Sequence, residues 1–255
     1  MDRRQILKAA GVTSTIPLAS GLGAARSGER EKADGSDRGQ ARRECAQPQC
    51  IHPVLGYSGL EGEEQVPAPL QPQYEVDLIT RPPDAESERP LPEFFFQPTG
   101  LAVEPGDVVR FNLETPDHTV TAYHPQLGRQ RRVPEGVPAF SSPVLGTGTF
   151  WLYRFDQPGV YDVLCAPHEI FGMVARIVVG DPPAEPAFGP SGPVEMGGEE
   201  IELRPPALTA GLVYEDPLLE PSTIAERGSV SWDELAPESK EVLLEFPEPP
   251  AGEGE

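Results

Sequence analysis

The chain contains little lysine, cysteine, methionine or histidine for its 255 residues. Three of its 20 basic residues are lysines, and it has three cysteines, three methionines and four histidines. The shortage of cations excludes one class of partner, because nucleic-acid binding requires clustered positive charge on the folded surface. Arg129, Arg131 and Arg132 form the single basic cluster of the central region, and we interpret it as a solvated loop. We therefore expect no nucleic-acid partner.

The sequence also lacks a long, strongly hydrophobic run. Residues 9–25 are uncharged, but they are rich in Gly, Ser and Thr and contain Pro17, so they would make a poor permanent membrane span. This stretch follows Arg3 and Arg4, and the whole of 1–27 resembles a twin-arginine export signal. We expect an exported, extracytoplasmic protein at the cell surface or associated with the membrane. An uncleaved signal would act as the membrane anchor.

Negative charge is concentrated towards the C-terminus. The formal net charge is −21, and residues 182–255 hold 17 of the 41 acidic residues. This acidic, lysine-poor composition resembles that of halophilic proteins, which stay hydrated in concentrated salt. The 32 prolines and 26 glycines argue against uniform packing. We predict a polar linker at 28–70, a folded domain at 71–181 and an acidic, Pro-rich extension at 182–255, which we interpret as solubilising.

The central region has the pattern of an antiparallel β-sandwich, with short β-type runs separated by turn residues. The three aromatic residues at 151, 153 and 155 alternate with other residue types, which predicts one buried strand face. We expect seven strands, at 74–80, 101–103, 108–113, 118–122, 149–155, 159–164 and 174–179. Residues 123–148 are expected to form an irregular insertion, and the aromatic run at 94–96 is expected to plug one end of the sandwich. The predicted fold is all-β, a Greek-key sandwich or barrel with irregular N- and C-terminal extensions.

Metal-binding side chains occur at fixed spacings near the end of this region. Cys165 is followed after two residues by His168 and after four more by Met173, and His118 lies upstream. Copper that alternates between Cu(I) and Cu(II) prefers one thiolate and two imidazoles in a plane, with a weak axial thioether. Structural zinc sites instead use four Cys or His donors. We therefore take His118, Cys165, His168 and Met173 as the candidate ligands of a single type 1 copper ion.

The order of an isolated His, a long interval and Cys-x2-His-x4-Met resembles the plastocyanin, pseudoazurin and halocyanin branch of the cupredoxins. The flanking residues 158–161 and 172–181 resemble those of pseudoazurins and haloarchaeal cupredoxins most. The resemblance extends over about 71–181. It implies a cupredoxin-like fold with one blue copper centre, in which Met173 is the axial ligand.

The chain departs from these relatives directly after the first ligand. They have Asn there, and its side chain ties the two ligand loops together, whereas this chain has Thr119. The resemblance therefore gives no source for that brace here. Pro167 lacks an amide hydrogen and is unable to donate a hydrogen bond to the sulfur of Cys165. We expect the copper potential to reflect these differences.

The resemblance implies an electron carrier between extracytoplasmic redox partners, not an enzyme. Four histidines are too few for the additional copper ions of an oxidase or nitrite reductase, and a dinuclear copper domain would need a second Cys in the loop. We expect partners to dock on the apolar surface near His168, Ile170 and Phe171. The alternative is an exported copper-binding protein for copper delivery or storage, and a third reading is a surface protein with a vestigial site.

Two further groups remain open from the sequence. Cys45, Cys50 and His52 are compatible with a disulfide loop, a metal-binding tract or two unpaired exported cysteines, and export favours the disulfide. His124, six residues after His118, is read as a loop histidine, with a supporting or substitute ligand as the alternative.

Overall fold

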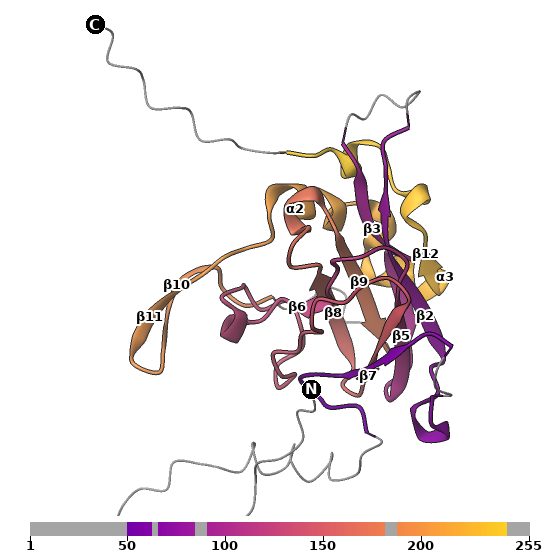
Figure 1. Cartoon of the computed structure of the whole chain (residues 1–255). Coiled ribbons are helices and arrows are strands. Elements are labelled where there is room, and N and C mark those ends of the chain that lie inside the picture. The colour runs from indigo at the N-terminus through magenta and orange to yellow at the C-terminus, as the bar shows by residue number, and fades with distance from the viewer. Residues whose placement is uncertain (1–49, 63–65, 85–90, 182–187, 244–255) are drawn as a thin grey trace, which may run out of the picture. The chain divides into compact units, whose positions relative to one another are not determined.

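The structure, a computed structural model, describes residues 50–62, 66–84, 91–181 and 188–243. They form two five-stranded sheets and a separate hairpin (Figure 1). The first sheet has the order β1 (Tyr57–Leu60), β7 (Thr149–Phe155), β5 (Asp107–Leu113), β2 (Tyr74–Arg81) and β3 (Glu93–Gln97). The second has the order β12 (Ser229–Val230), β4 (Gly100–Val103), β9 (Val174–Val179), β8 (Gly159–Leu164) and β6 (Thr121–Ala122). The hairpin consists of β10 (Gly192–Met196) and β11 (Glu199–Leu203).

From β3 to β8 the chain crosses from one sheet to the other at every step, whereas β1 to β3 share the first sheet and β8 and β9 share the second. β2 pairs in parallel with β5, β4 pairs in parallel with β9, and the other strand pairs are antiparallel. The α-helices of the described residues are α2 (Leu208–Tyr214) and α3 (Pro221–Arg227). Short 3-10 turns are η1 (Ala68–Leu70), η2 (Pro125–Leu127), η3 (Glu169–Phe171), η4 (Pro217–Leu219), η5 (Trp232–Glu234) and η6 (Glu238–Lys240). The predicted all-β sandwich fold is confirmed.

The main core lies between the sheets and follows strand periodicity. Trp151, Tyr153 and Phe155 of β7 enter this core, as the alternation predicts, and Phe140 of the irregular insertion packs among them. In β9 all six residues are buried, because alternate side chains enter the inter-sheet core and a second core on the outer face. Strands that are covered on both faces read as continuous apolar runs.

The outer face of the first sheet is covered by a segment that the sequence analysis assigned to the polar linker. β1 pairs with β7 and forms an edge of the sheet, and Ile51 and Leu70 pack with Phe150 and Leu152. The linker expected over 28–70 is therefore folded where it is described. Its apolar residues are too sparse to form a periodic pattern, and they become buried only because the outer face of β7 supplies the complementary surface.

The outer face of the second sheet is covered by the C-terminal extension. Tyr214 of α2, Ile224 of α3 and Trp232 are buried in a core with Val174 and Val178 of β9. The described part of the extension is thus a layer of the fold, which differs from the expected solubilising segment. The segment after Ser231 forms the short turn η5, with a capping box at Ser231.

The export signal predicted for 1–27 lies outside the described residues, as does Cys45. Cys50 is disulfide-bonded. Among the residues that the structure describes, none of the helices has the length and apolar character required to cross a membrane.

Candidate metal centre

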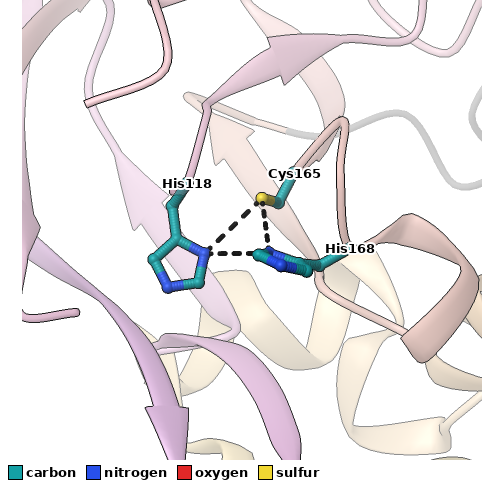
Figure 2. A group of neighbouring side chains, drawn as sticks. All are labelled: His118, Cys165 and His168. Atoms are coloured by element: carbon teal, nitrogen blue, oxygen red, sulfur yellow. Dashed lines mark hydrogen bonds between the residues drawn. The ribbon is translucent and has the colours of Figure 1, made fainter. Parts of the chain in front are cut away.

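Three of the four predicted ligands meet at one end of the sandwich. The Sγ atom of Cys165 lies 3.6 Å from Nδ1 of His118 and 3.4 Å from Nδ1 of His168, and the two Nδ1 atoms are 3.1 Å apart (Figure 2). All three donor atoms lie within 4.8 Å of one another. One sulfur and two imidazole nitrogens therefore converge on a single point.

The strand pairing explains why residues so distant in sequence meet. Cys165 follows the last residue of β8, and Thr121 of β6 lies opposite Leu164 of β8. The segment before β6 consequently runs beside Cys165, and the backbone N–H of Thr119 points at its Sγ at 3.4 Å. The sandwich itself brings the donors together.

The imidazole of His118 is fully buried and is held through its second nitrogen. Its Nε2 lies 2.8 Å from Oγ1 of Thr115 and 3.2 Å from Oγ1 of Thr80. An Nε2–H donated to these hydroxyls leaves the Nδ1 lone pair free to face Cys165, which is how metal-bound histidines are commonly oriented. The two threonines have no signature in the sequence, because they lie 3 and 38 residues from His118 and form no recognisable motif with it.

The imidazole of His168 is half-buried and is held by an aromatic ring. Phe94 stacks on it with ring centroids 4.2 Å apart and planes 17° from parallel, and Phe171 packs against Phe94 at 5.1 Å. The run at 94–96 is thus part of β3 and supplies a wall of the site, where a plug was expected. Its alternation places Phe95 on the opposite face, stacked on Trp232.

Met173 lies at the end of the same loop and is fully buried in the inter-sheet core. The Cys165 N–H donates to the Met173 carbonyl at 3.0 Å, and the Met173 N–H donates to the His168 carbonyl at 3.2 Å. The His168 N–H donates to the Cys165 carbonyl at 3.0 Å. The backbone of the loop therefore links these three residues directly.

Thr119 links the two ligand segments directly, at the position where the resemblance would place an Asn side chain. Its Oγ1 accepts a hydrogen bond of 2.8 Å from the backbone N–H of Ala166, directly after Cys165. The same Oγ1 lies 3.1 Å from Oγ1 of Thr121, and Thr119 is buried. The Thr119 side chain is shorter than that of Asn, but it forms the link because its hydroxyl oxygen accepts the hydrogen bond from this N–H.

Burial sets the protonation states of the cluster in the absence of metal. It lowers the pKa of His118 to about 4, with a further contribution from His168, and it lowers the pKa of His168 as well. It raises the pKa of the Cys165 thiol to about 11. At neutral pH both imidazoles are neutral and offer lone pairs, whereas the thiol must lose its proton when a metal binds.

The other two histidines have local structural roles. Nδ1 of His124 accepts from the Gln126 N–H and caps η2, and His124 is not in the cluster. Nδ1 of His52 accepts from the N–H groups of Val54 and Leu55 in a turn. The reading of His124 as a loop histidine agrees with this geometry.

The basic cluster is not a solvated loop. Arg129 forms an ion pair of 2.6 Å with the buried Glu169, and Arg132 forms one of 2.7 Å with the buried Asp162. Both guanidinium groups are largely covered, because the described part of the C-terminal extension packs over this region.

Residues 87–180 match the family of copper-binding proteins of the plastocyanin/azurin type. Pseudoazurin from Paracoccus pantotrophus is 38% identical over 88 residues, which are 34% of this chain and 54% of that protein. Pseudoazurin from Methylorubrum extorquens is 34% identical over 86 residues, 34% of this chain and 52% of that protein. The chain contains a cupredoxin domain. The chain spans about half the length of these relatives.

Among solved structures, pseudoazurin from Methylobacterium extorquens AM1 is 31% identical, with a TM-score of 0.32. The match covers 42% of this chain and 75% of that one. The cofactor of the cupredoxin domain is copper, and the donor set of one thiolate and two imidazoles fits a type 1 site.

Proposed function

We propose that this protein carries single electrons between extracytoplasmic redox partners with one type 1 copper ion. The observation that carries the proposal is the convergence of one sulfur and two imidazole nitrogens within 4.8 Å at one end of the sandwich. Copper would supply the Cu(I)/Cu(II) couple. The proposed ligands are His118, Cys165, His168 and Met173.

Each proposed ligand has a distinct role. Cys165 is the thiolate donor, His118 and His168 complete the plane, and Met173 is the weak axial ligand. The hydrogen bonds within the loop and the bond between Thr119 and Ala166 hold these side chains in place. A fixed set of ligands favours rapid electron exchange, because the two oxidation states then require little rearrangement.

The burial of two of the proposed ligands favours an electron carrier over an enzyme. Cys165 and His118 are fully buried, so a substrate has no direct approach to them from solvent. The half-buried ring of His168 is the proposed route for electrons, and partners would dock beside it. Ile170 is 51% exposed and is the main apolar contact of this surface, whereas Phe171 is half-buried against Phe94.

Export is part of the proposal. Residues 1–27 resemble a twin-arginine signal, and the disulfide at Cys50 is typical of proteins in oxidising compartments. An uncleaved signal would keep the carrier at the membrane.

Redox cycling with measurement of bound copper tests the proposal against copper delivery or storage. We expect the copper-loaded protein to undergo many cycles of reduction and oxidation with an excess of Cu(I) chelator present, and to retain its copper. Transfer of copper to the chelator on each reduction would contradict the carrier function and favour delivery.

A further inference from the structure

Glu169 is a buried carboxylate in the middle of the ligand loop. It directly follows His168, begins η3 and is 3% exposed. Electron transfer through the proposed ligands makes no use of this charge. A charged side chain is costly to bury unless it is paired and hydrogen-bonded, so its partners show what it is built to hold.

The partners of Glu169 come from the residue that directly follows β6, from the body of the irregular insertion and from the C-terminal extension. The hydroxyl of Tyr123, next to β6, donates to Oε1 at 2.8 Å. Nη1 of Arg129, in the irregular insertion, lies 2.6 Å from Oε2. The backbone N–H of Ala207, which precedes α2, donates to Oε1 at 3.1 Å. One carboxylate therefore links the ligand loop to the sandwich, the insertion and the C-terminal extension.

The insertion and the extension are also bonded to each other. Arg129 and Arg204 form a parallel β-bridge, and the Gln130 N–H donates to the Arg204 carbonyl at 2.8 Å. The Gly189 N–H donates to the Arg131 carbonyl at 2.9 Å. These bonds fix the place from which the extension reaches Glu169.

The extension also contacts the far end of the ligand loop. A Cβ atom at Gly172 would lie 3.1 Å from Cγ2 of Thr209 and 3.3 Å from Cγ2 of Val213, both in α2. Gly172 has φ +86°, in the left-handed region that glycine occupies without strain. α2 is thus packed directly on the turn that precedes Met173.

We propose that Glu169 is a positioning residue of the copper centre, through which the C-terminal extension holds the ligand loop. This inference deepens the proposed electron-carrier function and rests on it. A loop that is tied on its outer side keeps His168 and Met173 in place in both oxidation states. In this protein the extension is consequently part of the redox centre as well as a cover for the second sheet.

Two variants each remove one partner of Glu169. Ala207→Pro deletes the N–H donor of the extension and places the Cδ atom of the ring against Oε1 of Glu169, while the backbone tolerates it because φ at Ala207 is −56°. Tyr123→Phe deletes the hydroxyl and keeps the ring. Tyr161→Phe is the matched control, since its hydroxyl donates to the Gln157 carbonyl at 2.7 Å and lies towards the other end of β8.

The first readout is amide hydrogen exchange in metal-free protein. We expect the His168, Phe171 and Gly172 amides to exchange roughly tenfold faster in Ala207→Pro and in Tyr123→Phe, the change that loss of one buried hydrogen bond produces. Tyr161→Phe should leave these amides unchanged while lowering the melting temperature.

The second readout is the copper-loaded protein. The two test variants should shift the copper potential and the hyperfine splitting of the electron paramagnetic spectrum, and the control should shift neither. If all three variants lower only the melting temperature and leave loop exchange, potential and spectrum as in the wild type, the positioning role is refuted. A wild type without a thiolate-to-copper band would refute the electron-carrier function itself and the copper role of Glu169 with it.

Discussion

His118 and His168 direct the same atom, Nδ1, towards the sulfur of Cys165, yet they are held in different ways. His118 is fully buried, and its Nε2 contacts two threonine hydroxyls. His168 is half-buried, and its ring lies flat on Phe94. The inner imidazole is thus fixed by hydroxyl groups that contact its second nitrogen, and the outer one by its own loop and by an aromatic ring of β3. Stiffness and access to partners therefore come from different ligands.

Removal of either imidazole ligand should have the greatest effect on the site, and rescue by added imidazole should distinguish the two positions by their access to solvent. Both His118→Gly and His168→Gly should lose the blue band, because each removes a ligand. Added imidazole should restore the band in His168→Gly at far lower concentration than in His118→Gly, since a free imidazole reaches only the half-exposed position easily. Titration of imidazole against visible absorption measures this. Rescue of both variants at the same concentration would contradict the distinction.

Thr119→Val should have the next largest effect. It leaves the Ala166 N–H without its acceptor in a buried link between the two ligand segments, which costs about 1–3 kcal/mol. Urea unfolding of the metal-free protein measures the loss. Thr119→Ser keeps the hydroxyl and should recover most of it, whereas a serine variant as unstable as the valine variant would show that the methyl group matters and the link does not.

Phe94→Leu tests the support of the outer imidazole. Loss of the stacked ring should cost about 0.5–1.5 kcal/mol and shift the copper potential. Phe95→Leu, on the opposite face of β3, is the control. It should cost more stability, because Phe95 is fully buried against Trp232, yet leave the potential unchanged. An unchanged potential in Phe94→Leu would mean that the stack does not support the site.

Ile170→Asp should have the smallest effect on the site and act on docking alone. The electron self-exchange rate should fall several-fold, because two copies would bring like charges together where an apolar contact was made, and the visible spectrum should stay the same. Leu60→Asp is a matched control, since Leu60 is 52% exposed, as Ile170 is to a similar degree, but lies in β1 at the edge of the first sheet. Equal slowing by both substitutions would remove Ile170 from the docking surface.

The strands are well predicted because they have local signatures, and the proposed ligand set has a local signature too. The seven expected strands correspond to β2 and β4 to β9, although the one expected at 118–122 is reduced to β6, and His118 forms only an isolated bridge to Leu145. The loop from Cys165 to Met173 is recognisable in the sequence from the types of its donor residues and their spacing. The structure brings three of the four predicted ligands together, and the role of Met173 stays a prediction.

The remaining features depend on contacts between distant segments. β1 and the helices α2 and α3 gain their stability from the outer faces of the sheets, and their own sequences show little periodicity. Phe94 reads as one member of an aromatic run, and its contact with His168 arises from the pairing of β3 with β2. Arg129 reads as a solvated cation until the buried Glu169 is placed beside it.

The decisive measurement for a type 1 copper centre is a comparison of the visible and electron paramagnetic spectra of the oxidised, copper-loaded protein with those of Cys165→Ser. We expect an intense thiolate-to-copper band in the wild type and its complete loss in the variant, because Cys165 is the proposed thiolate donor of the cluster. A wild-type protein that is colourless with copper, or a band that persists in Cys165→Ser, would contradict the proposed type 1 centre.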